Sequence, residues 1–190
     1  MKKSIGINER IFPNPVLVLG TYDESGMPNA ATFAWGGVAS SNPPAISVAV
    51  RPSRYTYENL MKRKAFTASL ATEEYLAEID YFGIASGRDG NKIEKVGLTA
   101  SRAEFVDAPY IEELSYTIEC EVIHTLDLGA HVLFIGEIKD VKISDILIDE
   151  NGKLDLSNSG FVTFDSVSGT YLKMGEVADK AFSVGLKYRT

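Results

Sequence analysis

The strongest constraint on the fold is a long stretch in which apolar side chains recur at every second position. Apolar residues alternate with more polar ones over 116–124, and after a turn at 127–129 the chain runs back through 131–143. A two-residue period places every second side chain on one face of a β-strand. The pattern therefore predicts an antiparallel hairpin, in which Gly136 marks a bulge or a close approach of another part of the chain.

Further segments have the composition of β-strands and are separated by turn signals. Residues 23–28 read Asp-Glu-Ser-Gly-Met-Pro, which is typical of a hairpin turn. A double proline at 43–44 precedes a segment in which Ile and Val alternate with the small residues Ala and Ser. The predicted strands are 15–22, 29–38, 46–50 and 65–70, and 177–186 is predicted to close the fold as a strand-like or irregular segment.

Helices are predicted only in the middle of the chain. The hydroxyl-rich residues 53–56 can cap the free amides of a first helix. Thr72 is a suitable N-cap for a second helix with one apolar face, and Gly83 and Gly97 are suitable stops for the second and third. The predicted helices are 57–64, 73–82 and 91–96, the last two within an insert spanning 71–101.

This order of elements favours an antiparallel barrel over a βαβ sheet, because strands are short and many and the helices are confined to one insert. The 190 residues fit a single domain spanning 1–190, since compact domains most often contain about 100 to 200 residues. Hydrophobic residues make up 45% of the chain, which is enough for a core without disulfides. We therefore predict one mainly β domain.

The charge balance narrows the possible partners. There are 19 basic and 26 acidic residues, a formal charge of -7, which disfavours nucleic acid and anionic lipid as partners. The single Cys120 has no partner for an internal disulfide, and the opening residues lack an apolar targeting segment. The apolar runs are too short for a membrane-spanning helix. A cytoplasmic protein without a membrane segment is the prediction.

Several common catalytic signatures are missing from the sequence. It contains no G-x-G-x-x-G after a strand, no P-loop motif, no H-E-x-x-H and no G-x-S-x-G. A metal site would need to combine His124 and His131 with Cys120, yet Cys120 and His124 are about 13 Å apart along one strand. We predict no metal site and interpret Cys120 as a small core residue.

A basic cluster stands out in this acidic chain. Residues 51–59, Arg-Pro-Ser-Arg-Tyr-Thr-Tyr-Glu-Asn, follow a strand and open a helix. Two guanidinium groups, two hydroxyls and the free amides of a helix start suit a phosphate monoester. The alternative is an arginine-bearing surface turn with an ordinary helix cap, and spacing alone does not decide between the two.

A second segment offers space for a flat ring. Residues 29–41 are mostly small and surround Trp35, the only tryptophan of the chain. An isoalloxazine needs an aromatic or apolar wall and a few backbone amides and hydroxyls at its polar edge, and a strand of small residues exposes such amides. The alternative is that Trp35 anchors the core and the alanines pack tightly around it.

Taken in order, these segments resemble the flavin reductase-like FMN-binding split-barrel family over nearly the whole chain. The residues 155–176 match this family poorly, whereas the ordered set of matching pieces is specific. The matching pieces are 13–23, 29–41, 42–44, 54–57, Asn59, 80–83, 86–88, Lys92, 107–109, Gly129, His131, 134–137 and 180–182.

The resemblance implies a homodimer of Greek-key split β-barrels with a few short helices, which binds FMN without a covalent bond near the subunit interface. It implies a phosphate site formed by Arg51, Ser53, Arg54, Thr56 and Asn59, with Ser86, Arg88 and Lys92 as helpers. It implies a ring and ribityl site lined by Asn29, Thr32, Trp35, Ser40 and Ser41.

His131 is the catalytic candidate that the resemblance implies, because an imidazole beside the flavin can steady a reduced-flavin anion or position a donor. The alternative is a loop-end histidine that makes one hydrogen bond. If the connecting loop is symmetric, His124 faces His131 across the hairpin, so both remain candidates.

The function implied is that of a flavin-dependent oxidoreductase. Electrons would arrive from NAD(P)H or another donor and leave to a redox protein or a small-molecule acceptor, with FMN performing the redox chemistry. Two alternatives are an FMN electron carrier without turnover of its own and a non-redox FMN-binding protein. The sequence does not distinguish NADH from NADPH.

Overall fold

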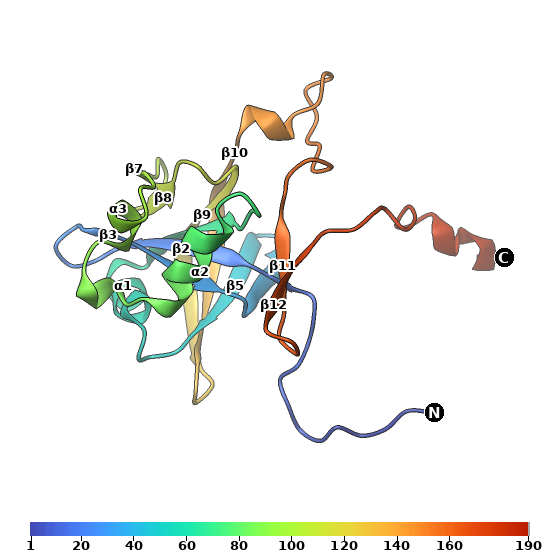
Figure 1. The fold of residues 1–190 in the computed structure, drawn as a ribbon, viewed down its shortest axis with the longest axis horizontal. Helices are drawn as coiled ribbons and strands as arrows, with labels where there is room; N and C mark the ends of the chain where they lie inside the picture. Colours follow the sequence, from blue (N-terminus) through green and yellow to red (C-terminus); the bar gives the residue numbers. More distant parts are fainter. Residues whose placement is uncertain (190) are drawn as a thin grey trace.

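The structure is a computed structural model and describes residues 1–189. Its centre is a seven-stranded sheet with the spatial order β3-β2-β6-β9-β10-β5-β4, in which every neighbouring pair is antiparallel (Figure 1). The strands of this sheet are β2 (Leu17–Tyr22), β3 (Pro28–Phe33), β4 (Gly36–Ser41), β5 (Pro44–Val50), β6 (Ala65–Leu70), β9 (Tyr116–Asp127) and β10 (Val132–Ile143). The predicted mainly β, antiparallel class is confirmed.

The predicted hairpin is the pair β9 and β10 at the centre of the sheet. Register shifts occur between Ile135 and Gly136 and between Ile138 and Asp140. A Cβ on Gly136 would lie 2.6 Å from the ring of Phe66, which is closer than packed carbon atoms approach. Gly136 thus marks both a bulge and a close approach, as its place in the pattern predicts.

The predicted strand 29–38 is wrong, because the chain divides there into β3 and β4. These two strands lie at opposite edges of the sheet, although only Ala34 and Trp35 separate them. At Gly36 a Cβ would lie 2.8 Å from the side chain of Leu17 and 2.9 Å from a backbone oxygen of β5. The small residues of 29–38 therefore carry the chain closely across the end of the sheet, which curls it into a barrel.

The helices differ from the predicted ones at their ends. They are α1 (Tyr55–Arg63), α2 (Leu76–Ile84) and α3 (Lys92–Lys95), with short 3-10 turns η1 (Gly87–Asp89), η2 (Asp145–Leu147) and η3 (Val184–Tyr188). Thr72 does not cap α2, because it forms a β-bridge with Phe161. Gly83 does not end α2 either: it lies inside the helix, where a Cβ would be 3.5 Å from Thr32. That distance is an ordinary van der Waals contact, so α2 packs against β3 there without a steric need for glycine. Gly97, at φ +76°, follows α3 as predicted.

Two small sheets were not predicted from the sequence. One joins β1 (Asn14–Pro15), β11 (Val162–Asp165) and β12 (Thr170–Lys173), and the other joins β7 (Ala100–Arg102) and β8 (Pro109–Ile111). For 177–186, the irregular alternative of the prediction is confirmed and the strand-like one is wrong, since these residues are exposed and contain coil, turn and part of η3. Figure 1 shows this end of the chain leading away from the barrel, and within residues 1–189 it joins none of the three sheets.

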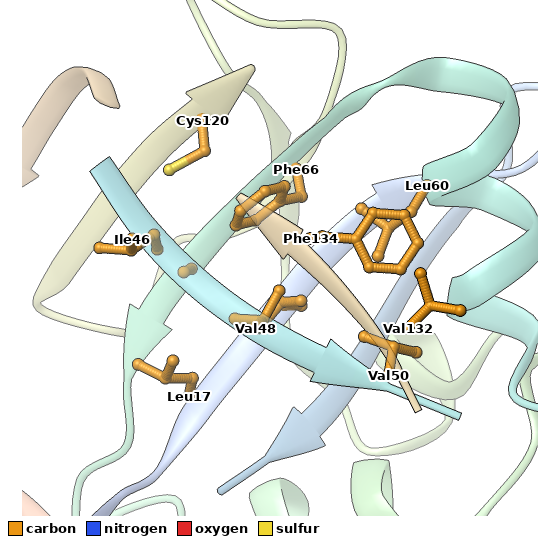
Figure 2. Close-up of a cluster of buried hydrophobic side chains, with 11 residues drawn as sticks. Leu17, Ile46, Val48, Val50, Leu60, Phe66, Cys120, Val132 and Phe134 are labelled. Carbon is orange, nitrogen blue, oxygen red and sulfur yellow. The ribbon is translucent and has the colours of Figure 1, made fainter. Parts of the chain in front are cut away.

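Two buried clusters hold the fold together. The first fills the barrel, where Phe66, Phe134 and Cys120 are fully buried among aliphatic side chains (Figure 2). Burial raises the pKa of the Cys120 thiol to about 12, so that the residue behaves as the apolar core side chain that the sequence predicts. The second cluster lies beneath α2, around Ile79 and Phe82.

The core also contains a buried carboxylate that the sequence does not predict. The side chain of Glu119 is 0% exposed, and its two oxygens accept hydrogen bonds from the backbone N–H groups of Glu104 at 3.2 Å and Phe105 at 2.7 Å. The ammonium of Lys142 lies 3.4 Å away. A buried charge persists only when it is paired and hydrogen-bonded, and here these bonds tie the loop after β7 to the central strand β9.

Replacing Glu119 by Gln is expected to lower the free energy of unfolding by about 2 kcal/mol, because one amide N–H₂ then faces a backbone N–H and a buried donor loses its acceptor. Urea denaturation followed by circular dichroism measures the change. The control is Glu121→Gln, two residues along the same strand, whose side chain is 59% exposed and pairs with Lys139; its change stays below about 1 kcal/mol. Equal losses in the two variants would contradict a role for the buried carboxylate.

Candidate functional site

A cavity of about 530 Å³ opens at one end of the barrel, between the start of α1, the strand β3 and the segment from α2 to α3. Its volume lies within the range of about 300 to 1,000 Å³ that is usual for small-molecule sites. Eleven of the fourteen predicted site residues line it: Asn29, Thr32, Trp35, Arg51, Ser53, Arg54, Thr56, Ser86, Arg88, Lys92 and His131. The structure therefore brings residues from distant parts of the chain to one place.

The start of α1 forms the polar end of the cavity. The predicted hydroxyl cap is wrong, because the N-cap is Arg54 and makes no side-chain cap bond within the described chain. The first amides of an α-helix have no acceptor inside the helix and carry a partial positive charge. Ser53 and Thr56 line the cavity beside these amides. This end therefore suits an anion.

Lys92 brings a buried positive charge to the same end. It is only 4% exposed, and its Nζ donates hydrogen bonds to the carbonyl oxygens of Phe82 at 2.9 Å and Ala85 at 3.0 Å. Desolvation by burial, followed by the charge of Arg54, lowers the pKa of Lys92 to about 8. Both causes disfavour the ammonium ion, and an anion in the cavity would favour it.

Arg88 connects η1 to the start of α1. It donates to the carbonyl oxygen of Ser53 at 3.1 Å and to the carboxylate of Glu58 at 2.5 Å, and its guanidinium lies 5.4 Å from the centre of the Tyr55 ring. Ser86 caps η1 by accepting the backbone N–H of Arg88. Tyr55 was not predicted as a site residue; its hydroxyl donates to Asp23 at 2.9 Å. These bonds hold the anion end in shape.

Behind Thr56 lies a buried network of hydrogen bonds. The amide of Asn59 donates to the hydroxyl oxygen of Thr21 at 3.1 Å, and the amide of Asn29 donates to Thr21 at 3.3 Å and to Thr56 at 3.1 Å. Asn59 is 3% exposed and does not line the cavity formed by residues 1–189. It thus lies behind the residues that line the anion end, and Thr21, which sequence reasoning missed, joins it to Asn29.

The same network leaves one acceptor unused at the cavity wall. Asn29 is 4% exposed, and within residues 1–189 its Oδ1 atom has no hydrogen-bond partner. A Cβ on Gly87 would lie 2.3 Å from this oxygen, so that only a glycine fits beside it. A buried acceptor without a partner costs about 1 to 3 kcal/mol. A ligand with a hydroxyl or amide donor at this point would satisfy it.

Aromatic and imidazole rings form the outer end of the cavity. The rings of Trp35 and His131 are nearly parallel, at 8°, with centroids 6.4 Å apart, and the Arg51 Nε donates to the His131 Nε2 at 3.4 Å. Trp35 is 42% exposed, which excludes the alternative of a core anchor. The predicted pairing of His124 with His131 is wrong, because His124 lies opposite Ile135 in the hairpin.

Other residues are placed differently from the prediction. Ser40 and Ser41 are on β4, opposite Ala45 and Pro44, and lie outside the cavity that residues 1–189 form, so their role at a cofactor stays a prediction. Two residues that were missed, Phe164 on β11 and Tyr171 on β12, line the cavity. Their strands are four residues long, which is too short for a clear period.

Among residues 1–189, no cluster of three or more His, Cys, Asp or Glu side chains has the geometry to hold a metal ion. In the same residues, no helix has the length and apolar character needed to span a membrane.

The antiparallel barrel, with a cavity that has a cationic end and an aromatic end, is that of the flavin-related split-barrel proteins. Residues 9–161 match the family described as "Flavin reductase like domain", and the chain belongs to this family. Flavoredoxin of Desulfovibrio vulgaris (Miyazaki F) is 40% identical, with a TM-score of 0.92 over 97% of this chain and 100% of that one.

Two further relatives agree with this assignment. Flavoredoxin from Methanosarcina acetivorans is 26% identical, with a TM-score of 0.89 over 98% of this chain and 100% of that one. An uncharacterized protein of Archaeoglobus fulgidus is 35% identical over 130 residues, which are 68% of this chain and 72% of that protein. The predicted split-barrel fold and the predicted resemblance to this family are confirmed, and the chain has a flavin-related role.

Replacing Thr21 by Val is expected to lower the free energy of unfolding by about 2 kcal/mol, because two buried amide donors lose their shared acceptor. Urea denaturation measures the loss. The control is Thr125→Val on β9, an exposed threonine, for which the change stays within about 0.5 kcal/mol. If Thr21→Val is as stable as the control, the buried network does not stabilise the cavity wall.

Proposed function

We propose that the chain binds FMN without a covalent bond in this cavity and acts as a flavin-dependent oxidoreductase. The observation that carries the proposal is the polarity of the cavity: a cationic end at the start of α1 and an end lined by Trp35 and His131. FMN has a phosphate dianion at one end and a planar ring at the other. The ligand and the cavity therefore have the same order of chemical groups.

The phosphate is proposed to lie against Arg54, Thr56 and the first amides of α1. Charge-assisted hydrogen bonds from a guanidinium are stronger than neutral ones, and a helix start favours an anion. The phosphate would also relieve the repulsion between Arg54 and Lys92, which contributes to the lowered pKa of Lys92. Arg88 shares its guanidinium with Ser53 and Glu58, so it acts mainly by holding this end in shape.

The ribityl chain is proposed to pass Asn29. Its hydroxyl groups are donors, and the Oδ1 atom of Asn29 is a buried acceptor at the cavity wall. Thr32 is a weaker candidate for a ligand contact, because its hydroxyl already donates to the carbonyl oxygen of Ile79 at 2.5 Å. Asn29 is thus the proposed hydrogen-bond partner of the middle of the ligand.

When bound, FMN supplies the redox chemistry, and the residues of the chain bind and orient it. The Arg51 Nε lies 3.4 Å from the Nε2 atom of His131 and orients the imidazole, which lines the cavity. An imidazole beside the flavin can interact with a negatively charged reduced ring or position a donor. His131 is therefore the proposed catalytic residue.

We also propose the homodimer that the family resemblance implies. Large apolar side chains are exposed on both terminal segments, among them Ile5, Ile7 and Phe182, and burial of such side chains against a second copy is favourable. A cytoplasmic location is part of the same proposal. Size-exclusion chromatography with light scattering tests the oligomeric state.

Replacing Arg54 and Thr56 by Ala is expected to weaken FMN binding at least about tenfold, because a charge-assisted phosphate bond contributes about 1.5 to 3 kcal/mol. Riboflavin, which lacks the phosphate, is affected much less. Titration followed by flavin fluorescence measures both affinities. The control is Arg102→Ala, which removes an arginine side chain that is 77% exposed and lies outside the cavity. A purified protein that is colourless and does not bind added FMN would overturn the proposed function, whereas equal losses for FMN and riboflavin would overturn only the phosphate assignment.

The proposed reductase activity has a direct test. Under anaerobic conditions, NADH or NADPH is expected to bleach the visible band of the FMN-loaded protein in the absence of any other protein. Dithionite serves as the control, because it reduces flavin without a binding site for a nicotinamide. The second candidate, an electron carrier, is favoured by the exposure of Trp35 at the mouth of the cavity. Reduction by dithionite but by neither nicotinamide would select the carrier.

A further inference from the structure

The far wall of the cavity comes from a part of the chain beyond the family match. The match ends at residue 161, and the β-hairpin of β11 and β12 follows at 162–173. Phe164 on β11 and Tyr171 on β12 line the cavity, and their ring centroids are 5.9 Å apart. The anion end thus lies within the residues matched by the family model, and the hairpin that completes the wall follows that match.

This hairpin is fixed to the body of the protein on two sides. Its strand β11 pairs with β1, so that Phe164 lies opposite Asn14. Val162 is 6% exposed, and its backbone N–H donates to the carbonyl oxygen of Ala71 at 3.1 Å. At the other strand, Lys173 forms an ion pair with Glu73. Figure 1 shows the hairpin beside the barrel, with the exposed C-terminal segment continuing from it.

A hydrogen bond between Tyr171 and Asp80 sets the position of the hairpin against α2. The Tyr171 hydroxyl donates to the Asp80 Oδ1 at 2.8 Å. Burial, followed by the hydrogen bond and the charge of Asp80, raises the pKa of Tyr171 to about 12. The phenol therefore remains protonated, and thus a donor, at neutral pH.

This wall is aromatic, with the rings of Phe164 and Tyr171 inclined at 56° to each other. Phe164 presents an aromatic ring, Val16 beside it is aliphatic, and the hydroxyl of Tyr171 is already bonded to Asp80. Aromatic rings favour offset stacking or edge contacts with other flat rings. In contrast to the anion end, this wall offers no free cation for a carboxylate or phosphate.

We propose that the β11–β12 hairpin is the binding wall for a flat, uncharged electron acceptor of the quinone class, with Phe164 and Tyr171 as specificity-determining residues and Asp80 as a positioning residue. The proposal rests on the proposed function, since the electrons come from the reduced flavin. Two electrons and two protons pass to the quinone, which becomes the hydroquinone, and the flavin returns to its oxidised form.

The test uses the FMN-loaded protein with menadione as the quinone and ferricyanide as a small anionic acceptor that needs no flat wall. Titration of the oxidised holoprotein with menadione, followed by the flavin spectrum, gives a Kd without turnover. Anaerobic reoxidation of the reduced holoprotein by each acceptor gives the rates. Phe164→Ala is expected to raise the menadione Kd at least tenfold and to raise its KM in parallel, while the ferricyanide rate stays within twofold.

Tyr171→Phe keeps the ring and removes only the bond to Asp80, so it tests the wall even if Phe164→Ala does not fold. It is expected to raise the menadione Kd three- to tenfold. The separate variant Asp80→Asn keeps an acceptor oxygen for the Tyr171 hydroxyl and is expected to retain most of the wild-type affinity. The matched control is Leu172→Ala on the same strand, outside the cavity lining, which leaves the Kd unchanged.

Three outcomes would overturn the proposal. In the first, the wild-type protein binds FMN, but the FMN-loaded form shows no saturable menadione binding. This outcome overturns the proposal for the hairpin and leaves the proposed function intact. In the second, Phe164→Ala and Tyr171→Phe leave the menadione Kd unchanged. In the third, FMN affinity falls as much as menadione affinity, which makes the hairpin a wall for the cofactor itself. A wild-type protein that does not bind FMN overturns both proposals.

Discussion

The two-residue connection between β3 and β4 is the constraint on which the architecture depends. Three Cα-to-Cα steps span at most about 11 Å, yet this connection joins the two opposite edges of a seven-stranded sheet. The sheet therefore has to curl until its edges meet, and Gly36 makes the crossing possible because no Cβ fits there. The same geometry holds Trp35 at the opening between the edges, where it lines the cavity.

The remaining site residues follow from this closure. β5 and β10 are antiparallel, with Val50 opposite Val132, so the segment after β5 and the turn before β10 lie at the same end of the barrel. Arg51 and His131 flank these two residues and are within hydrogen-bond distance of each other. The chain then enters α1 directly, which brings the start of the helix to the same end. A binding site at the end of a barrel is thus a consequence of strand register.

The sequence predicts those features that depend on neighbouring residues, such as the alternation of apolar side chains along a strand. The alternation in β9, β10 and β5 is sufficient to locate these strands. The basic run at 51–59 indicates a candidate anion site but does not by itself separate it from an arginine-bearing surface turn. The sequence does not show that 29–38 is divided between two edges, because small residues fit either edge. Nor can spacing distinguish Thr56, which lines the cavity, from Asn59, which lies behind it. That distinction depends on Thr21, a tertiary neighbour from β2.

Two unfavourable contributions to the free energy of folding, both at the cavity, connect the stability of the folded chain to ligand binding. Lys92 is buried near Arg54, which disfavours its charged form, and Asn29 holds an acceptor without a partner in the described chain. Both terms reduce the stability of the folded chain, and an anion with hydroxyl donors would reverse both. A ligand that binds only the folded state stabilises it by an amount that grows with the logarithm of its concentration. The groups that make this end of the barrel unfavourable by itself are therefore the same groups that, in the proposed function, bind the phosphate and the ribityl chain.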